Sequence, residues 1–290
     1  TATVRQDGYS GFAKNFKSAL FPSVALGWII SSENFMANVK QVSFLKLRAG
    51  YGAIGNQTTR YQSLSRVSTN SSYVFGDGGG TAFGQQLSSL ENPNLKWERT
   101  IGMNLGVDFT LLNNRLTGSL DYYNNNTFDL LFDLTIPTVT GFSLITSNIG
   151  KINNKGFEAG LTYKVIDNKD FKWSSTFNFW ANTNKIVTLT GIDANGDGIE
   201  DDLVSSNLFI GKSIQTIFDY KADGIYQLGE TRLPGFQTGS FRVVDNDKTG
   251  TITAADRMFL GRQEPAYRFS WFNNVSYKNF SLSVFLNSVQ

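Results

Sequence analysis

The residues with the clearest chemical pattern lie between Asp245 and Asp256. Oxygen-bearing side chains stand at loop positions one, three and five, namely Asp245, Asp247 and Thr249, and a glycine follows at position six. Asp256 closes the loop at position twelve, and Thr251 at position seven would add a backbone carbonyl. This is the spacing of a calcium loop, in which hard oxygens replace the water around the ion and glycine permits the sharp turn. We therefore predict Ca²⁺ as a cofactor held by these residues; the alternative is a plain Asp/Asn/Gly turn.

A second acidic segment shows the first half of the same pattern. Asp193, Asn195 and Asp197 match positions one, three and five, and a glycine again follows at six. Position twelve is Val204, which cannot bind a cation, so a nearby carboxylate would have to take its place. These three residues are a weaker candidate for metal binding, and a solvated acidic loop explains them as well.

The composition points away from catalysis and from nucleic acid. The chain has 290 residues and no histidine, so a Ser-His-Asp arrangement cannot be built within it. It has no cysteine, and therefore neither disulfides nor thiol chemistry. The net charge of +2 does not indicate a nucleic-acid partner. We expect a protein that is not an enzyme.

The elements that would carry these loops are β-strands. From Trp97 to Leu111 the odd positions are apolar apart from Arg99, whereas the even positions are mostly polar or glycine. Strict alternation places one set of side chains on each face of a strand. A run of this length, apolar on one face and polar on the other, suits a tilted strand crossing an outer membrane.

The alternation recurs in further segments with charges confined to one face. They are Phe44 to Ala53, Gly156 to Val165, Phe171 to Ala181 and Tyr267 to Ser276. With the strand-like runs Thr1 to Gln6, Leu20 to Ile30 and Phe280 to Leu286 we count about nine strands. The fold class is therefore all-β, an antiparallel transmembrane β-barrel segment; a soluble β-sandwich or solenoid is the alternative.

The connections between these strands alternate in length. Short turns are expected at Asn113-Asn114, at Asp167 to Asp170 and at Lys278-Asn279, because Asn and Asp tolerate turn conformations. Long connections are expected over residues 54–93, 133–155 and 188–264. Outer-membrane barrels have short periplasmic turns and long extracellular loops, so the long connections should share the extracellular rim.

The expected strand number suggests part of a larger barrel. Bacterial single-chain barrels have even strand counts, and a sheet with two open edges in a membrane would leave backbone groups unpaired. We therefore expect residues 1–290 to form part of one barrel domain of a longer chain.

Several short motifs, in order along the chain, resemble those of the SusC/RagA family of TonB-dependent outer-membrane transporters. The most specific is NPNLKWE at Asn92 to Glu98, which resembles the signature that opens a barrel strand in that family. The other matching segments are TATVRQDGYSGF at Thr1, FPSVALGW at Phe21, LKLRAGYGAIGNQ at Leu45, NIGKINNKGFE at Asn148, DGIYQ at Asp223, the Asp245 to Gly261 loop before Pro265, and the turn YKNF at Tyr277.

The resemblance implies more than these residues can show. It implies a barrel of about 22 strands with a plugged lumen, in the outer membrane of a Gram-negative bacterium. The expected function is TonB-dependent import of oligosaccharides together with a SusD-like surface lipoprotein, with outer-membrane lipids around the barrel. A peptide importer of the same family is the first alternative, and a surface binding or adhesion protein that does not transport is the second.

Overall fold

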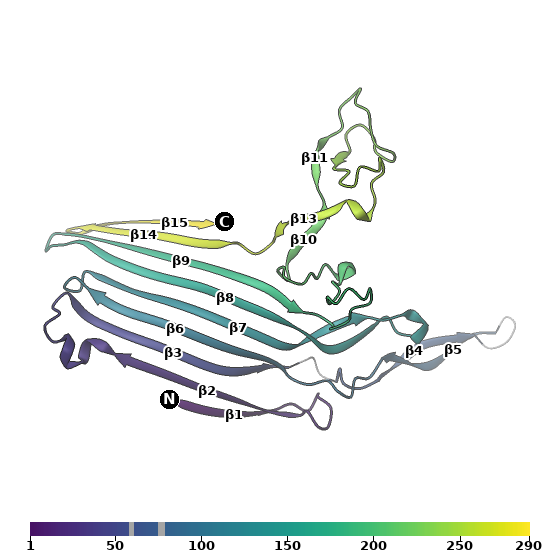
Figure 1. Cartoon of the computed structure of the whole chain (residues 1–290), viewed down its shortest axis with the longest axis horizontal. Helices are drawn as coiled ribbons and strands as arrows, with labels where there is room; N and C mark the ends of the chain where they lie inside the picture. Colours follow the sequence, from purple (N-terminus) through teal and green to yellow (C-terminus); the bar gives the residue numbers. More distant parts are fainter. Residues whose placement is uncertain (58–60, 75–78) are drawn as a thin grey trace.

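A computed structural model of the chain describes residues 1–57, 61–74 and 79–290. Within them, nine strands form one antiparallel sheet in the order β1-β2-β3-β6-β7-β8-β9-β14-β15 (Figure 1). Their bounds are β1 Ala2–Gly8, β2 Ser18–Ile29, β3 Val42–Asn56, β6 Glu98–Leu111, β7 Leu116–Thr135, β8 Leu144–Asp167, β9 Phe171–Thr188, β14 Tyr267–Tyr277 and β15 Phe280–Val289. The expected all-β barrel wall is therefore confirmed, in the form of an open curved sheet.

The remaining elements belong to the connections. Three two-stranded sheets pair β4 (Arg66–Val74) with β5 (Thr81–Ser89), β10 (Thr216–Tyr220) with β13 (Arg257–Arg262), and β11 (Ala222–Ile225) with β12 (Phe241–Val243). Single 3-10 turns lie at Ile30–Ser32, Asn34–Met36, Thr138–Thr140, Val204–Ser206 and Ala254–Asp256. The described residues contain no helix that is long and apolar enough to cross a membrane.

The two faces of the sheet differ as the alternation predicts. A cross-strand row on one face joins Leu26, Ala49, Leu105, Tyr122 and Phe157 by direct pairing. Leu26 is 68% exposed and Leu105 46% exposed, although both are aliphatic. An apolar face this large and this exposed fits hydrocarbon rather than water. We call it the outer face.

The opposite face is polar and is called the lumen face. Asp108 lies on it, since its carboxylate bonds Arg48 of β3 at 2.7 Å. Asn104 shares this face with Asp108 because the two are four residues apart in one strand. The predicted division of β6 between the two faces is thus confirmed.

The three predicted turns lie on one rim of the sheet, and the two longest connections, β3 to β6 and β9 to β14, lie on the opposite rim (Figure 1). The predicted turns follow β6, β8 and β14, and backbone bonds join neighbouring turns along that rim: Leu112 donates to Gln41 at 2.8 Å and Lys278 to Asp170 at 2.8 Å. At the β6–β7 turn Asn113 and Asn114 have φ of 55° and 65°, a conformation that Asn tolerates well. We call this edge the short-turn rim and the opposite edge the long-loop rim.

The predicted loop 133–155 is wrong in its extent. Strands β7 and β8 continue to Thr135 and from Leu144, so only residues 136–143 connect them. The sequence hides this extension because the strands are Asn-rich here and because Asp129, with φ of 55°, leaves the extended conformation without a shift of register. Gly150 lies opposite Asp129 with φ of 77°, and a Cβ there would lie 2.9 Å from the Thr188 carbonyl.

Candidate functional site

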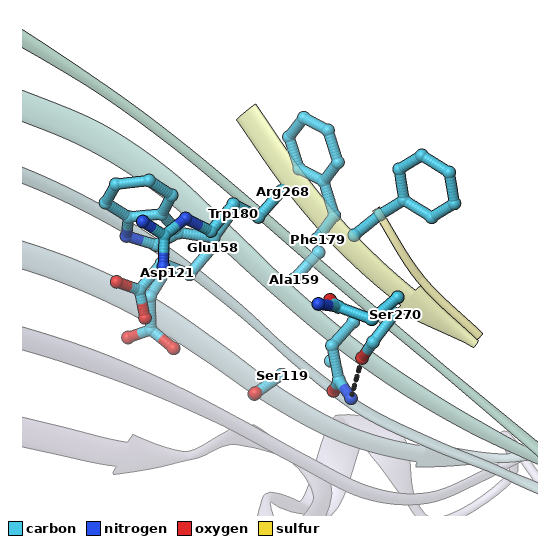
Figure 2. A pocket seen from close by; sticks show the side chains of 12 residues that line it. Ser119, Asp121, Glu158, Ala159, Phe179, Trp180, Arg268 and Ser270 are labelled. Carbon is cyan, nitrogen blue, oxygen red and sulfur yellow. Dashed lines mark hydrogen bonds between the residues drawn. The ribbon is translucent and has the colours of Figure 1, made fainter. Parts of the chain in front are cut away.

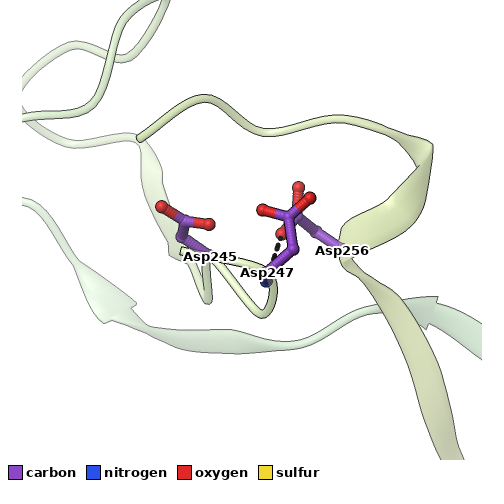
Figure 3. A group of neighbouring side chains, drawn as sticks. All are labelled: Asp245, Asp247 and Asp256. Carbon is purple, nitrogen blue, oxygen red and sulfur yellow. Dashed lines mark hydrogen bonds between the residues drawn. The ribbon is translucent and has the colours of Figure 1, made fainter. Parts of the chain in front are cut away.

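The predicted cation loop brings its carboxylates together between β12 and β13, immediately before the strand that pairs with β10. Asp245, Asp247 and Asp256 each offer an oxygen, and these oxygens lie within 4.8 Å of one another (Figure 3). The loop closes on its own backbone: Asp245 accepts the Thr249 N–H at 3.1 Å and the Gly250 N–H at 2.7 Å. Gly250 has φ of 82°, which glycine adopts without strain.

Asp256 is the anchor of this loop. Its side chain is 1% exposed and accepts backbone N–H groups from Thr253 at 2.7 Å, Asn246 at 2.8 Å and Asp247 at 3.3 Å. These bonds, led by that from Thr253, hold the pKa of the Asp256 carboxyl below its usual value, against the opposing effect of burial. The residue predicted as the last ligand therefore also fastens the two ends of the loop together.

The other two predicted ligands lie in the same turn. The Thr249 hydroxyl donates to the Thr251 carbonyl at 3.1 Å, so both oxygens are close to one another. Carboxylate, hydroxyl and carbonyl oxygens form the hard donor set that Ca²⁺ prefers. The residues present thus fit a divalent cation, with Asp245 and Asp247 as the most exposed carboxylates of the set.

The second acidic loop uses its side chains on its own backbone. Asp193 accepts N–H groups from Gly196, Asp197 and Gly198, and Asn195 accepts from Asp197. Asp201 is turned back onto the Ala194 N–H at 2.7 Å. The described residues of this loop do not gather three carboxylates as the first loop does. Asp193 and Asn195 therefore stabilise a turn by accepting backbone N–H groups, and the loop matches a calcium loop only at positions one, three, five and six.

The middle of the lumen face carries an ion-pair network over three strands. Arg48 of β3 contacts Asp108 of β6 at 2.7 Å and Asp121 of β7 at 2.9 Å. Arg48 reaches β7 because the intervening residue is Gly106: a Cβ there would lie 2.6 Å from the Arg48 Cζ and from the Asp121 Oδ1. The alternation gives Gly106 no specific role, but a glycine is required at this position because Arg48 and Asp121, its cross-strand neighbours, contact each other over it.

A shallow pocket continues this row across the lumen face. Glu158, Trp180 and Arg268 follow Asp121 by direct pairing, and the Arg268 guanidinium lies 5.5 Å from the Trp180 ring (Figure 2). Its other polar lining residues are Ser119, Asn178, Ser270 and Asn287. Asn178 donates to Ser270 at 3.2 Å. The alternation places Glu158 and Arg268 on this face, whereas Trp180 is an aromatic residue at a polar position of β9 and was not predicted to lie here.

The NPNLKWE motif ties neighbouring hairpins together at the long-loop rim. Leu95 is fully buried, and the Trp97 ring packs against Phe12 and Phe21 at 5.2 and 5.7 Å. On the other side, Asn148 of β8 accepts the Lys96 N–H and donates to the Lys96 carbonyl, both at 2.8 Å. The motif therefore holds the start of β6 between the β1–β2 and β7–β8 hairpins.

The aromatic residues of the longest connection pack within it. Phe209, Phe218 and Phe259 form a cluster with ring centroids 4.7 to 5.0 Å apart, and Tyr226 packs on Phe236 at 5.9 Å. Phe218 and Tyr226 therefore pack within the longest connection.

Fold and site together define a wall segment of an outer-membrane β-barrel with structured loops on one rim. The family described as TonB dependent receptor-like, beta-barrel matches residues 1–287, and the chain belongs to this family. Such receptors are outer-membrane proteins of Gram-negative bacteria, as the sequence predicts.

Individual relatives cover the whole chain. It is 36% identical over 299 residues to TonB-dependent receptor P3 of Formosa agariphila and 35% identical over 295 residues to TonB-dependent receptor SusC of Bacteroides thetaiotaomicron. These matches cover 99% of this chain and about 30% of the relatives. The RagAB peptide transporter superposes with a TM-score of 0.77 at 25% identity, over 99% of this chain and 31% of that chain.

Proposed function

We propose that this chain forms the wall and outer loops of a transporter that imports oligosaccharides across the outer membrane with energy supplied through TonB. The observation that carries the choice of cargo is the pocket on the lumen face. It sets the Trp180 ring beside carboxylate, amide and hydroxyl groups. An aromatic ring that covers the apolar face of a sugar, with polar groups around it for the hydroxyls, suits saccharide recognition.

The long-loop rim would face the cell exterior and meet a SusD-like lipoprotein. This assignment rests on the rule that outer-membrane barrels carry their long loops outside. Its support in this chain is the exposed apolar surface of the β11–β12 hairpin, where Phe241 (68% exposed) pairs directly with Ile225 (47% exposed) and Leu228 in the connecting loop is 92% exposed. Adjoining exposed apolar side chains of this kind commonly mark a protein contact.

Peptide import is the second candidate, favoured by the superposition on the RagAB peptide transporter. The two cargo classes are separated by uptake of labelled oligosaccharides and labelled peptides into cells with and without the receptor and with and without TonB. Saccharide uptake that needs both proteins supports the proposal. Uptake of peptide alone selects the alternative, and binding without uptake selects a surface adhesion protein.

The role of the pocket is tested by Trp180→Ala against Phe177→Leu, a residue of the same strand that lies on the outer face and outside the pocket. If the pocket binds cargo, Trp180→Ala reduces saccharide uptake while Phe177→Leu leaves it unchanged at equal amounts of receptor in the membrane. If uptake by both variants equals uptake by the unmodified receptor, the assignment of cargo binding to this pocket is refuted.

We propose also that the loop from Asp245 to Asp256 binds Ca²⁺ and thereby orders the tip of the longest connection. The cation would reduce repulsion among three neighbouring carboxylates. The test is calorimetric titration of the intact receptor with CaCl₂. The variant Asp245→Asn/Asp247→Asn removes two carboxylates from the proposed site. The control variant Asp193→Asn/Asp197→Asn removes the same number of charges from the other acidic loop. Loss of a binding event in the first variant alone supports the proposal. Titrations that are the same in both variants and the unmodified protein would refute it.

A further inference from the structure

Four cations lie together on the outer face, between its apolar row at Leu105, Tyr122 and Phe157 and the long-loop rim. Phe157 ends the apolar run of β8, and Lys155 is the next outward residue toward the long-loop rim. Lys185 of β9 pairs with Asn153, and Arg99 of β6 pairs with Phe128, which in turn pairs with Lys151. Alternation along each strand places all of them on the side of Leu105 and Tyr122. We call Arg99, Lys151, Lys155 and Lys185 the outer-rim cations.

The outer-rim cations are available for a partner. Arg99, Lys155 and Lys185 are exposed, and within the described residues none of the four contacts a carboxylate. The Phe128 ring lies between two of them, 4.7 Å from the Lys151 Nζ and 6.0 Å from the Arg99 Cζ. Asp129, the neighbouring acid, is held by Lys96 at 3.1 Å. The positive charge is therefore uncompensated.

Neutral hydrogen-bonding groups fill the space between these cations. The Asn153 Nδ2 donates to the Asn124 Oδ1 at 2.6 Å and to the Asn126 Oδ1 at 3.2 Å, which places the three amides on one face. The outer face thus changes from aromatic to amide and cationic within two residues along β7 and β8. Apolar residues followed by amides and cations match the order of acyl chains and headgroups in a lipid leaflet.

We propose that the outer-rim cations bind the phosphate groups of an anionic lipid in the leaflet next to the long-loop rim. The apolar band would contact the acyl chains, Lys155 and Lys185 would lie at the level of the phosphates, and Arg99 with Lys151 would lie further out. Charge complementarity favours a phosphorylated headgroup over a neutral one, and continuity with the lipid-contacting face favours a membrane lipid over a soluble anion. The proposal does not depend on which cargo is transported.

The test is native mass spectrometry of the intact receptor in detergent with bisphosphorylated lipid A and with its dephosphorylated form. The variant Arg99→Gln/Lys155→Gln/Lys185→Gln is compared with Lys40→Gln/Lys169→Gln/Lys172→Gln, which removes three exposed lysines at the short-turn rim. Each outer-rim cation is expected to contribute about fivefold in affinity, so the first variant should lose on the order of a hundredfold and the second little.

A charge-preserving variant guards against misfolding. Lys155→Arg/Lys185→Arg keeps the charge and should retain the phosphorylated lipid. Equal retention of both lipid forms by the unmodified receptor would overturn the proposal, as would equal losses in the two triple variants. Failure of the charge-preserving variant to retain the lipid would also overturn it, provided that this variant folds.

Discussion

At the scale of single residues, glycine has a defined role on the lumen face. Gly106 lies beneath the Arg48–Asp121 ion pair, whereas Gly50 on the same face has open space where a Cβ would be. We predict that Gly106→Ala displaces this pair and destabilises the fold by about 1–3 kcal/mol, the usual cost of leaving buried or half-buried polar partners unsatisfied. Gly50→Ala is the control and should change stability by less than about 0.5 kcal/mol. Urea unfolding in detergent measures both; equal midpoints would contradict the prediction.

The outer face offers a second test at one residue. An arginine at Leu105 would be placed in hydrocarbon, and we predict a cost of about 2–4 kcal/mol if it lies near the midplane of the bilayer. Asn104→Arg, one residue away, points to the lumen face and should cost much less. Folding of both variants into lipid vesicles, followed by urea titration, gives the two free energies. A cost at Asn104 that equals the cost at Leu105 would mean that the two faces are assigned incorrectly.

At the scale of elements, the cation loop should respond to acid through Asp256. Its pKa is lowered in the folded loop because the charged carboxylate accepts three backbone N–H bonds. The stabilisation is therefore fully present above the unfolded pKa of about 3.9 and is lost as pH falls through the lower, folded pKa. The protection factors of the Asn246 and Thr253 amides, taken relative to the unstructured exchange rate at each pH, should be high at neutral pH and fall below about pH 4. In Asp256→Asn, protection should be weak at both pH values; full protection there would contradict the role of the charge.

The elements also show what the sequence can reveal. Period-two alternation was sufficient for β6, because its outer residues meet hydrocarbon and its lumen residues meet polar partners. It failed for the ends of β7 and β8, where Asn124 and Asn153 bond each other across strands and provide no contrast between the faces. The carboxylates of the cation loop were predictable because all of them lie within twelve consecutive residues. The pocket around Trp180 was not, since its members come from five strands that only the sheet order brings together.

At the scale of the whole molecule, the two rims should lie on opposite sides of the membrane. These 290 residues contain no cysteine, so an introduced thiol is the only one among them, and the receptor without it serves as the labelling background. Leu228 of the longest connection is 92% exposed, and Asn279 of the β14–β15 turn is also exposed. In intact cells a thiol reagent that cannot cross the outer membrane should label Leu228→Cys and leave Asn279→Cys unlabelled.

Disruption of the outer membrane provides the control for this experiment, because both thiols should then react. Labelling of Asn279→Cys alone in intact cells would show that the barrel has the opposite orientation. It would place the acidic loop, the exposed apolar hairpin and the outer-rim cations on the periplasmic side. The proposed contacts with a surface lipoprotein and with lipid phosphates of the outer leaflet would then fail together, because both depend on the same orientation of the sheet. Labelling of Leu228→Cys alone would fix that orientation and leave each contact to be tested by its own variants.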